Sequence, residues 1–321
     1  MKKNFYRISC VLAIITALII SGCSTQNLPL TKPKIKIKIQ SAMVNIKPQP
    51  TEPIEISITS LHELDTLFDK YQYSSEDWEQ GQRELPRITF EKMTDDWQED
   101  SQNLPVETKK SLFFRLMAPL ILMANENIIR EREIVKHAAL NSLELKQIAL
   151  KYRLIKNKSN TITITMRQTL LKKVDILPPS LALAQAAEES GWGTSRFANE
   201  GNAFFGQWDF SGDGMKPKQQ RKALGNYGVA RFDSPLASVK GYMLNINTND
   251  AYHKLHVVRA QLRAKHQKIT GLALVDTLGK YSERGQDYID GLREMIRYNN
   301  LQFVDNGYLA DNRLVHLTSE E

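Results

Sequence analysis

Residues 178–193 read PPSLALAQAAEESGWG, and this stretch contains both the start and the end of one helix. Pro178, Pro179 and Ser180 mark its beginning, because proline is favoured at the start of a helix. From Leu181 to Ala187 the side chains are almost all small or apolar, and glycines at positions 191 and 193 then end the helix. We therefore predict a helix with two adjacent carboxylates, those of Glu188 and Glu189, in its last turn.

These two carboxylates are followed at once by glycines and a tryptophan, an arrangement that can place an acid at the wall of a groove beside an aromatic face. Sugar hydrolysis needs an acid that stays protonated near neutral pH, and burial against apolar groups achieves this by raising the pKa of a glutamate. Successive helical residues point about 100° apart, so only one of Glu188 and Glu189 is expected to face the groove. From the doublet alone, two ordinary helix-end charges are the alternative interpretation.

The chain that follows this helix becomes rich in glycine and aromatic residues. Residues 201–232 contain six glycines and short runs, such as Tyr227–Phe232, that predict a small β-hairpin lobe. Further helices are predicted over residues 234–245, 270–281 and 288–299. The expected fold class is therefore mainly α (α+β), with a minor β element.

The chain that precedes this helix is also predicted to be largely helical. Residues 105–139 have a long apolar periodicity that includes Pro119, which predicts a kinked, buried helix whose densest part is too short to span a bilayer. Further helices are expected over residues 61–68 and 141–155, with a polar loop over residues 71–84. This N-terminal region, residues 56–160, either forms a domain of its own or covers the domain that follows it.

The first residues predict export. Basic residues precede an apolar run, Ile8–Ile20, that is too short for a comfortable membrane span. The next residues, Gly22, Cys23 and Ser24, resemble a bacterial lipoprotein box, with a small residue before the acceptor cysteine. On this hypothesis residues 1–22 are a signal peptide and Cys23 is acylated. An uncleaved anchor and a cleaved secretory signal are the alternatives.

Residues 23–55 are basic and interrupted by prolines, which predicts a tether between the lipid and the folded body. Within it, lysine and isoleucine alternate from Lys34 to Ile39. This period of two fits an edge strand or a solvated extended segment. Ser24, rather than an aspartate, follows the cysteine and resembles lipoproteins that are directed to the outer membrane. We therefore expect the protein in the cell envelope, anchored to the membrane through Cys23 at the periplasmic face of the outer membrane.

Composition excludes several classes of protein. The only cysteines among the 321 residues are Cys10 and Cys23, which leaves none in the body for a disulfide scaffold, a zinc finger or a cysteine nucleophile. Eight basic residues lie in residues 1–47, which contain no acid, so a formal charge of +7 leaves the rest of the chain close to neutral. Nucleic-acid binding thereby loses its main support in the composition. Among the six histidines only His253 and His256 have a spacing that a metal site could use, and no third ligand is evident nearby, so a surface pair is the favoured interpretation. No nucleotide loop is present, and neither a metal nor a cofactor is expected.

Four motifs follow one another in the second half of the chain: Ala184–Ser195, Asn202–Gly206, Phe232–Tyr242, and Tyr281–Ser282 with Tyr288. In this order they resemble the bacterial glucosaminidases of glycoside hydrolase family 73. Residues 245–249 and 281–285 are similar to the Bax-type bacterial members. The resemblance implies a lysozyme-like, two-lobed glucosaminidase domain over residues 161–303, followed by a C-terminal tail over residues 304–321.

The resemblance also implies an activity, the hydrolysis of the β-1,4 bond after N-acetylglucosamine in peptidoglycan glycan strands. Glu189 matches the general acid of the family, which protonates the leaving oxygen. Tyr281 matches a groove tyrosine that orients the sugar or the water. We expect Trp192, Asn202, Phe205 and Trp208 to contact substrate, with Phe205 and Trp208 as aromatic residues on the floor of the groove. Core packing is the alternative for Phe205, because a phenylalanine before a glycine turn is at least as often a core residue.

The chain departs from the family in its second carboxylate. Glycosidases usually place one about 5 to 9.5 Å from the acid, and family members often supply a glutamate from the hairpin lobe. Between Asn202 and Phe232 this chain has no glutamate, and Asp209 and Asp213 are the only acids. Either aspartate is a candidate, although Asp213 lies in a Ser211–Gly214 turn where aspartate is a routine choice. Substrate assistance by the N-acetyl group, a single-acid mechanism and weak activity are the other possibilities.

Three functions therefore stay open on the sequence. The first is a lipid-anchored peptidoglycan glucosaminidase, the second a lipoprotein that binds glycan strands in the same groove without cutting them, and the third a lytic transglycosylase. Release of new reducing ends from peptidoglycan would distinguish the hydrolase from the binding protein. Released fragments that end in an anhydro sugar, and are therefore lighter by one water, would identify the transglycosylase.

Overall fold

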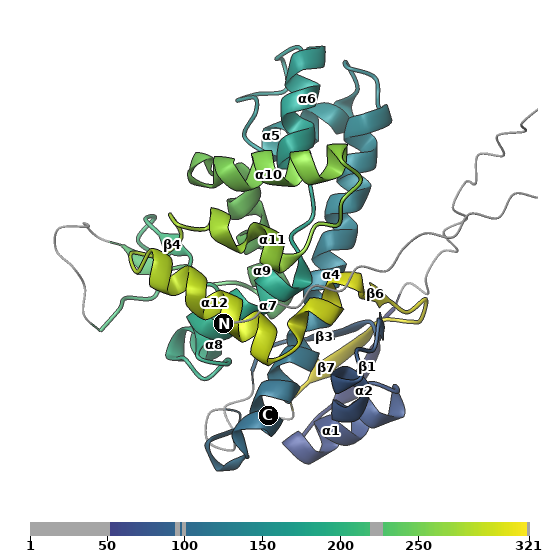
Figure 1. The fold of residues 1–321 in the computed structure, drawn as a ribbon, viewed down its shortest axis with the longest axis vertical. Helices are drawn as coiled ribbons and strands as arrows, with labels where there is room; N and C mark the ends of the chain where they lie inside the picture. Colours follow the sequence, from purple (N-terminus) through teal and green to yellow (C-terminus); the bar gives the residue numbers. More distant parts are fainter. Residues whose placement is uncertain (1–51, 94–96, 98–100, 219–226, 320–321) are drawn as a thin grey trace, which may run out of the picture. The chain divides into compact units, whose positions relative to one another are not determined.

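The computed structural model describes residues 52–93, 97, 101–218 and 227–319. The predicted signal peptide, Cys23 and nearly all of the predicted tether lie outside these residues, and so does Lys34–Ile39. Figure 1 shows the described elements, which are mainly helices with a few short strands. The predicted fold class, mainly α with a minor β element, is confirmed.

Helix α7 (Pro179–Ser190) is the helix predicted from residues 178–193, and it begins and ends where the sequence indicates. Every residue from Pro179 to Ala187 is buried. The helix ends at Gly191, whose φ of 56° is a left-handed conformation that glycine adopts at little steric cost. The small side chains of α7 let other helices approach it closely, so it forms part of the centre of the core.

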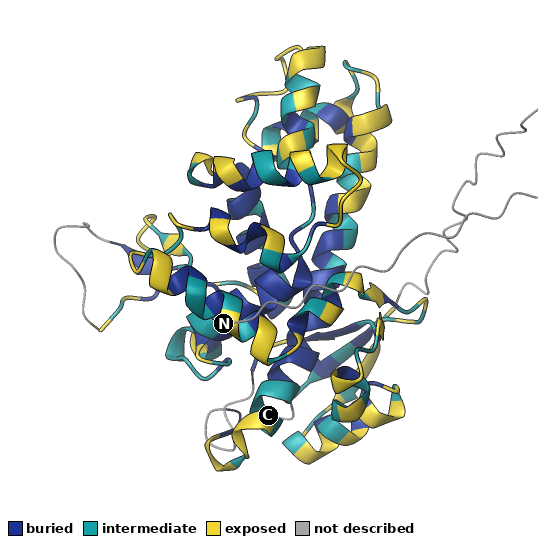
Figure 2. Ribbon diagram, in the orientation of Figure 1, coloured by how far each residue is buried: buried dark blue, intermediate teal, exposed yellow. Residues whose placement is uncertain are grey.

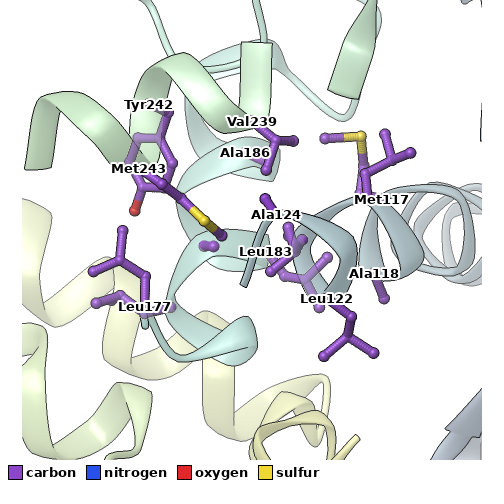
Figure 3. Packing of buried hydrophobic residues seen from close by; sticks show 14 of the residues in the cluster. Met117, Ala118, Leu122, Ala124, Leu177, Leu183, Ala186, Val239, Tyr242 and Met243 are labelled. Carbon is purple, nitrogen blue, oxygen red and sulfur yellow. The ribbon is translucent and has the colours of Figure 1, made fainter. Parts of the chain in front are cut away.

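Helix α4 (Val106–His137) packs against α7 and contains Pro119, as predicted. Its residues from Leu112 to Leu122 are all buried. Within the described ranges it is the one helix long and apolar enough to cross a membrane, but 78% of its apolar window is buried inside the protein, as expected for a core helix. Figure 3 shows Ala124 of this helix near Leu183 of α7.

The other helices pack around α4 and α7. Those in contact with α4 are α5 (Leu143–Lys151), α6 (Ile164–Lys173) and α9 (Pro235–Thr248), and α10 (His253–Ala264) packs on α6. Those in contact with α7 are α11 (Gly271–Leu274), α12 (Gln286–Tyr298) and the 3-10 helix η4 (Leu301–Asn306). Figure 2 shows the buried residues concentrated along α7 and the middle of α4, with exposed residues on the outer helices.

The loop that leads into α7 is held by Arg259 of α10. Its two terminal nitrogens donate to four backbone carbonyls within residues 172–176. The carboxylate of Asp175, in the same loop, is paired with Arg263. Because buried carbonyl groups need donors, this fully buried guanidinium determines where the chain enters α7.

Some predicted elements differ from the observed ones. The stretch expected as a polar loop contains α2 (Ser75–Glu79), which begins with a capping box formed by Ser74 and Asp77. The helix expected over residues 270–281 divides into α11 and the 3-10 helix η3 (Val275–Thr277), where the Thr277 hydroxyl donates to the Leu274 carbonyl and competes with helical bonding. Helix α10 was not predicted.

Residues of the expected C-terminal tail form strands. The central strand of a three-stranded parallel sheet is β7 (Val315–Thr318), which pairs with β1 (Ile54–Ser57) on one side and β3 (Ile88–Phe90) on the other. A second parallel pair joins β2 (Glu84–Leu85) to β6 (Tyr308–Leu309). The two ends of the described chain therefore meet in one sheet. The alternation of β7 covers only four residues, too few to be recognised in the sequence.

The N-terminal region belongs to the same core as the domain that follows it. Helix α1 (Leu61–Lys70), the sheet and α4 contribute buried side chains to one hydrophobic cluster that continues through α7, α9 and α12. The question left open by the sequence is thus answered in favour of a region that packs onto the domain that follows it.

The small lobe follows α8 (Arg196–Gly201) and contains the predicted hairpin. Its strands β4 (Trp208–Asp209) and β5 (Gly228–Val229) pair in antiparallel fashion. Met215 and Val229 join Ala203 in a small hydrophobic cluster distinct from the main core. This cluster gives the lobe packing of its own, in agreement with the two-lobed expectation.

Candidate active site

The neighbouring glutamates at the end of α7 have different environments. The carboxylate of Glu188 is ion-paired with Arg284, a largely exposed residue that lies before α12. Glu189 instead accepts a hydrogen bond at Oε1 from the hydroxyl of Tyr288 at 2.8 Å, from the side of α7 covered by α12. The rotation between successive helical residues separates the two side chains, as the sequence analysis expected.

Burial raises the pKa of Glu189 above its ordinary value, and the charge of Glu188 acts in the same direction. The hydrogen bond from Tyr288 and the charge of Arg284 act in the opposite direction, without cancelling the effect of burial. Desolvation disfavours the charged form of a carboxyl group, so Glu189 holds its proton to a higher pH than an exposed glutamate. This is the property that a general acid requires.

The second carboxyl oxygen of Glu189 lies next to Gly206. A Cβ atom at position 206 would come within 3.4 Å of Oε2, and the backbone there is left-handed, with a φ of +58°. Among the described residues Oε2 has no hydrogen-bond partner, so it is the oxygen available to a ligand. The left-handed backbone favours glycine at position 206, and a Cβ there would meet Oε2 at ordinary van der Waals distance.

Buried polar groups continue behind Glu189. The hydroxyl of Tyr288 also accepts a bond from Nε2 of Gln185 at 3.1 Å, and Oε1 of Gln185 accepts one from the hydroxyl of Tyr242 at 2.5 Å. Gln185 and Glu189 are four residues apart on α7 and so lie on the same face. A single polar residue in the otherwise apolar run from Leu181 to Ala187 was the sequence signal that could have identified Gln185.

Tyr281, expected as the groove tyrosine, lies beside this cluster. Its ring stacks on that of Tyr288, with centroids 5.6 Å apart and planes 5° from parallel. Its hydroxyl donates to the backbone carbonyl of Phe205 at 3.1 Å. The structure therefore brings Tyr281 next to the residue that holds Glu189, and ties it to the segment that leads to Gly206.

The two expected floor aromatics have different surroundings. Phe205 is 2% exposed and stacks on Tyr242 with centroids 3.9 Å apart, which is a core contact. Trp208 is 51% exposed on β4, where it stacks on Tyr227 and meets the edge of Phe210. Phe210, which is 64% exposed, was not singled out in the sequence. Trp208 and Phe210 together present aromatic surface two and four residues beyond Gly206.

Trp192 and Asn202 make structural contacts. The indole of Trp192 packs edge-on against Phe113 and Phe114 of α4, and its carbonyl accepts a bond from Trp97. Asn202, in a left-handed conformation at the end of α8, donates to the carbonyls of Glu91 and Phe232.

The two candidate aspartates lie in the exposed turn of the hairpin lobe. Asp209 accepts bonds from the backbone amide and the hydroxyl of Ser211, and these bonds lower its pKa. Asp213 is exposed and receives a long contact, 3.4 Å, from the same hydroxyl. The carboxylate that acts on the pKa of Glu189 is its neighbour Glu188, which is paired with Arg284. In the described ranges, no group of three His, Cys, Asp or Glu side chains is placed to hold a metal ion.

Comparison with known proteins agrees with this geometry. Residues 165–301 match the glucosaminidase family, described as mannosyl-glycoprotein endo-beta-N-acetylglucosaminidase. The chain is also similar to Protein bax of Escherichia coli (strain K12), with 34% identity over 198 residues that cover 60% of this chain and 70% of that protein. No solved structure matches. The chain therefore belongs to the glucosaminidase family, glycoside hydrolase family 73, as a Bax-type member.

Proposed function

We propose that this protein is a peptidoglycan hydrolase that cleaves the β-1,4 bond after N-acetylglucosamine, with Glu189 as the general acid. The observation that carries the proposal is the environment of Glu189, a largely buried carboxyl group with a raised pKa and one oxygen held by Tyr288. Such a group keeps its proton to a higher pH than an exposed glutamate and can give it to the leaving oxygen of a glycosidic bond.

The exposed aromatic residues that follow Gly206 support a polysaccharide substrate. Gly206 lies against Glu189, and Trp208 follows two residues later, within about 7 Å of extended chain. The exposed rings of Trp208 and Phe210 offer flat apolar faces on which sugar rings stack. Family membership and the predicted export signal favour peptidoglycan as the source of the glycan.

The second catalytic role is assigned to the substrate or to water. Both carboxyl oxygens of Asp209 are occupied by Ser211, which leaves this group poorly suited to act as a base or nucleophile. A mechanism in which the N-acetyl group assists, or in which water attacks without a second carboxylate, requires from the protein only the acid that Glu189 provides.

The test is reducing-end release from purified peptidoglycan by the full chain. We expect wild-type protein to generate reducing ends, Glu189→Gln to lower the rate by about 10²- to 10⁴-fold, and the matched control Glu188→Gln to stay within a few-fold of wild type. Wild-type protein that binds peptidoglycan without releasing reducing ends would instead identify a glycan-binding lipoprotein. Fragments lighter by one water would identify a lytic transglycosylase.

We further propose that the protein acts from a lipid anchor on Cys23, at the periplasmic face of the outer membrane. The support is the lipoprotein-like sequence that ends in Cys23 and Ser24. Labelling with a radioactive fatty acid should be lost in Cys23→Ser and kept in Cys10→Ser, the matched control. Label that persists in Cys23→Ser would contradict the anchor. Cell fractionation that separates the inner and outer membranes tests which membrane carries the protein.

A further inference from the structure

We infer that Tyr288, Gln185 and Tyr242 form a one-way hydrogen-bond relay that keeps the acid proton of Glu189 on Oε2, the oxygen beside Gly206. The inference rests on the proposed function, because it assigns positioning residues to the proposed acid. It adds to that function the oxygen from which the proton leaves and three residues that do not themselves react.

The direction of the relay follows from the chemistry of its groups. The hydroxyl of Tyr242 donates to Oε1 of Gln185, which can only accept, so Nε2 of the same amide faces Tyr288 and donates to it. With its oxygen accepting from Gln185, Tyr288 directs its own proton to Oε1 of Glu189. The chain of bonds thus ends at the strongest acceptor in the cluster.

The reverse orientation is unfavourable. If the amide of Gln185 were turned over, its oxygen would face Tyr288 and take that hydroxyl proton. Glu189 would then lose the donor at Oε1, and a largely buried carboxylate without a donor is costly. Gln185 and Tyr242 are almost completely buried, so water does not readily replace the missing bond.

The relay determines which oxygen of the neutral acid carries the proton. The carbonyl oxygen of a carboxylic acid is its better acceptor, so the oxygen that accepts from Tyr288, Oε1, is the carbonyl oxygen. The proton is therefore on Oε2, which has no other partner within the described residues and lies beside Gly206. This orientation presents the proton to a bound glycosidic oxygen without a prior rotation of the carboxyl group.

Several other groups also affect the titration of Glu189. Glu188 raises its pKa and Arg284 lowers it, and both lie on the exposed side of the helix end. The phenols of Tyr252 and Tyr281 lie close enough to interact electrostatically with Glu189, as do the two tyrosines of the relay, and burial keeps all four phenols neutral by raising their pKa. Among the described residues, the relay is therefore the donor path to Glu189 that can be removed without changing a formal charge.

The experiment follows the titration of Glu189 directly, by carbon-13 NMR of full-length protein with labelled glutamate carboxyl groups. Glu189→Gln identifies the resonance by its loss. We expect Tyr288→Phe to lower the acid dissociation constant of Glu189 by about tenfold, since a bond to the charged form is lost. Tyr242→Phe should act in the same direction by a smaller amount, because the amide of Gln185 loses the hydroxyl that donates to its oxygen and becomes a weaker donor to Tyr288. Tyr298→Phe, an exposed tyrosine on the same helix α12, should leave the titration as in wild type.

An unchanged Glu189 titration in Tyr242→Phe overturns the relay, and so does an unchanged titration in Tyr288→Phe. If a tyrosine variant fails to fold, Gln185→Met, which has similar size and no hydrogen-bonding amide, provides the same test. None of these measurements needs catalytic turnover. If the variants shift the titration of Glu189 as expected but the wild-type protein releases no reducing ends, the relay stands and only the proposed function is refuted.

Discussion

Gly206 lies so close to Glu189 that a methyl group on its α-carbon would come within 3.4 Å of Oε2. The contact joins the start of the hairpin lobe to the end of α7, and it involves the carboxyl oxygen that Tyr288 leaves unoccupied. A side chain at position 206 would therefore contact the open oxygen of the proposed acid.

Replacing Gly206 with alanine should lower activity by more than its effect on folding explains. The left-handed φ of +58° costs an alanine about 1–2 kcal/mol of stability, and the new methyl group also partly covers Oε2. Gly212→Ala is the matched control, because Gly212 also has a positive φ but no atom within 4 Å of the position that its new methyl group would take. Thermal unfolding and reducing-end release should show similar loss of stability in both variants, with a large loss of rate in Gly206→Ala alone.

The raised pKa of Glu189 predicts a specific dependence of stability on pH. A carboxyl group whose pKa is higher in the folded state binds more protons there than in the unfolded state, so its contribution to stability falls as pH rises from the unfolded pKa through the folded one. Glu189→Gln, which resembles the protonated form, should therefore melt at a higher temperature than wild type at neutral pH, with a smaller difference near pH 4. Equal differences at both pH values would contradict this prediction.

The aromatic surface of the hairpin lobe should contribute to substrate binding rather than to the chemical step. Trp208→Ala and Phe210→Ala are each expected to weaken binding to purified peptidoglycan by roughly tenfold, a loss of about 1.4 kcal/mol per stacked ring, with kcat little changed. Both rings are more than half exposed, so stability should change little. Tyr298→Ala removes an aromatic ring of similar exposure from α12 and should bind as wild type does.

The last strand should be essential for folding of the body. Leu317 of β7 is buried between two parallel neighbours, and Leu317→Ala should lower the free energy of unfolding by about 2–5 kcal/mol. Leu143→Ala, at an exposed position in α5, should cost less than about 0.5 kcal/mol. Urea unfolding of the two variants measures the difference, and similar losses would show that residues 315–318 do not support the core.

Much of the helical fold was predictable because its signals are local. The small apolar run of α7, its proline start and its glycine end lie within sixteen residues, and α4 has an apolar periodicity many turns long. Helix α2 was missed because its capping box, formed by Ser74 and Asp77, lies in a polar stretch whose two buried aromatics, Tyr73 and Trp78, do not form a periodic signal. Strand β7 was missed because its partners, β1 and β3, are more than two hundred residues away in the chain.

The candidate site was predicted only in part, because its contacts also join segments that are far apart in the sequence. Motif order selected Glu189 over Glu188 in the sequence. In the structure the two differ in their partners, since Glu188 pairs with Arg284 and Glu189 accepts a hydrogen bond from Tyr288. Phe205, expected in the groove, is packed in the core because its ring stacks on Tyr242.

The sequence by itself determined where the helix with the two glutamates begins and ends, because backbone preferences of proline, glycine and small residues act over a few neighbours. It also determined the family, through motifs whose order can be read without knowing their contacts. Only the tertiary structure decided that desolvation raises the pKa of Glu189, which of its oxygens is held and which is open. Those properties depend on Tyr288, Gln185 and Gly206, which meet around Glu189 only when distant segments pack, and desolvation acts on the pKa only once they have done so.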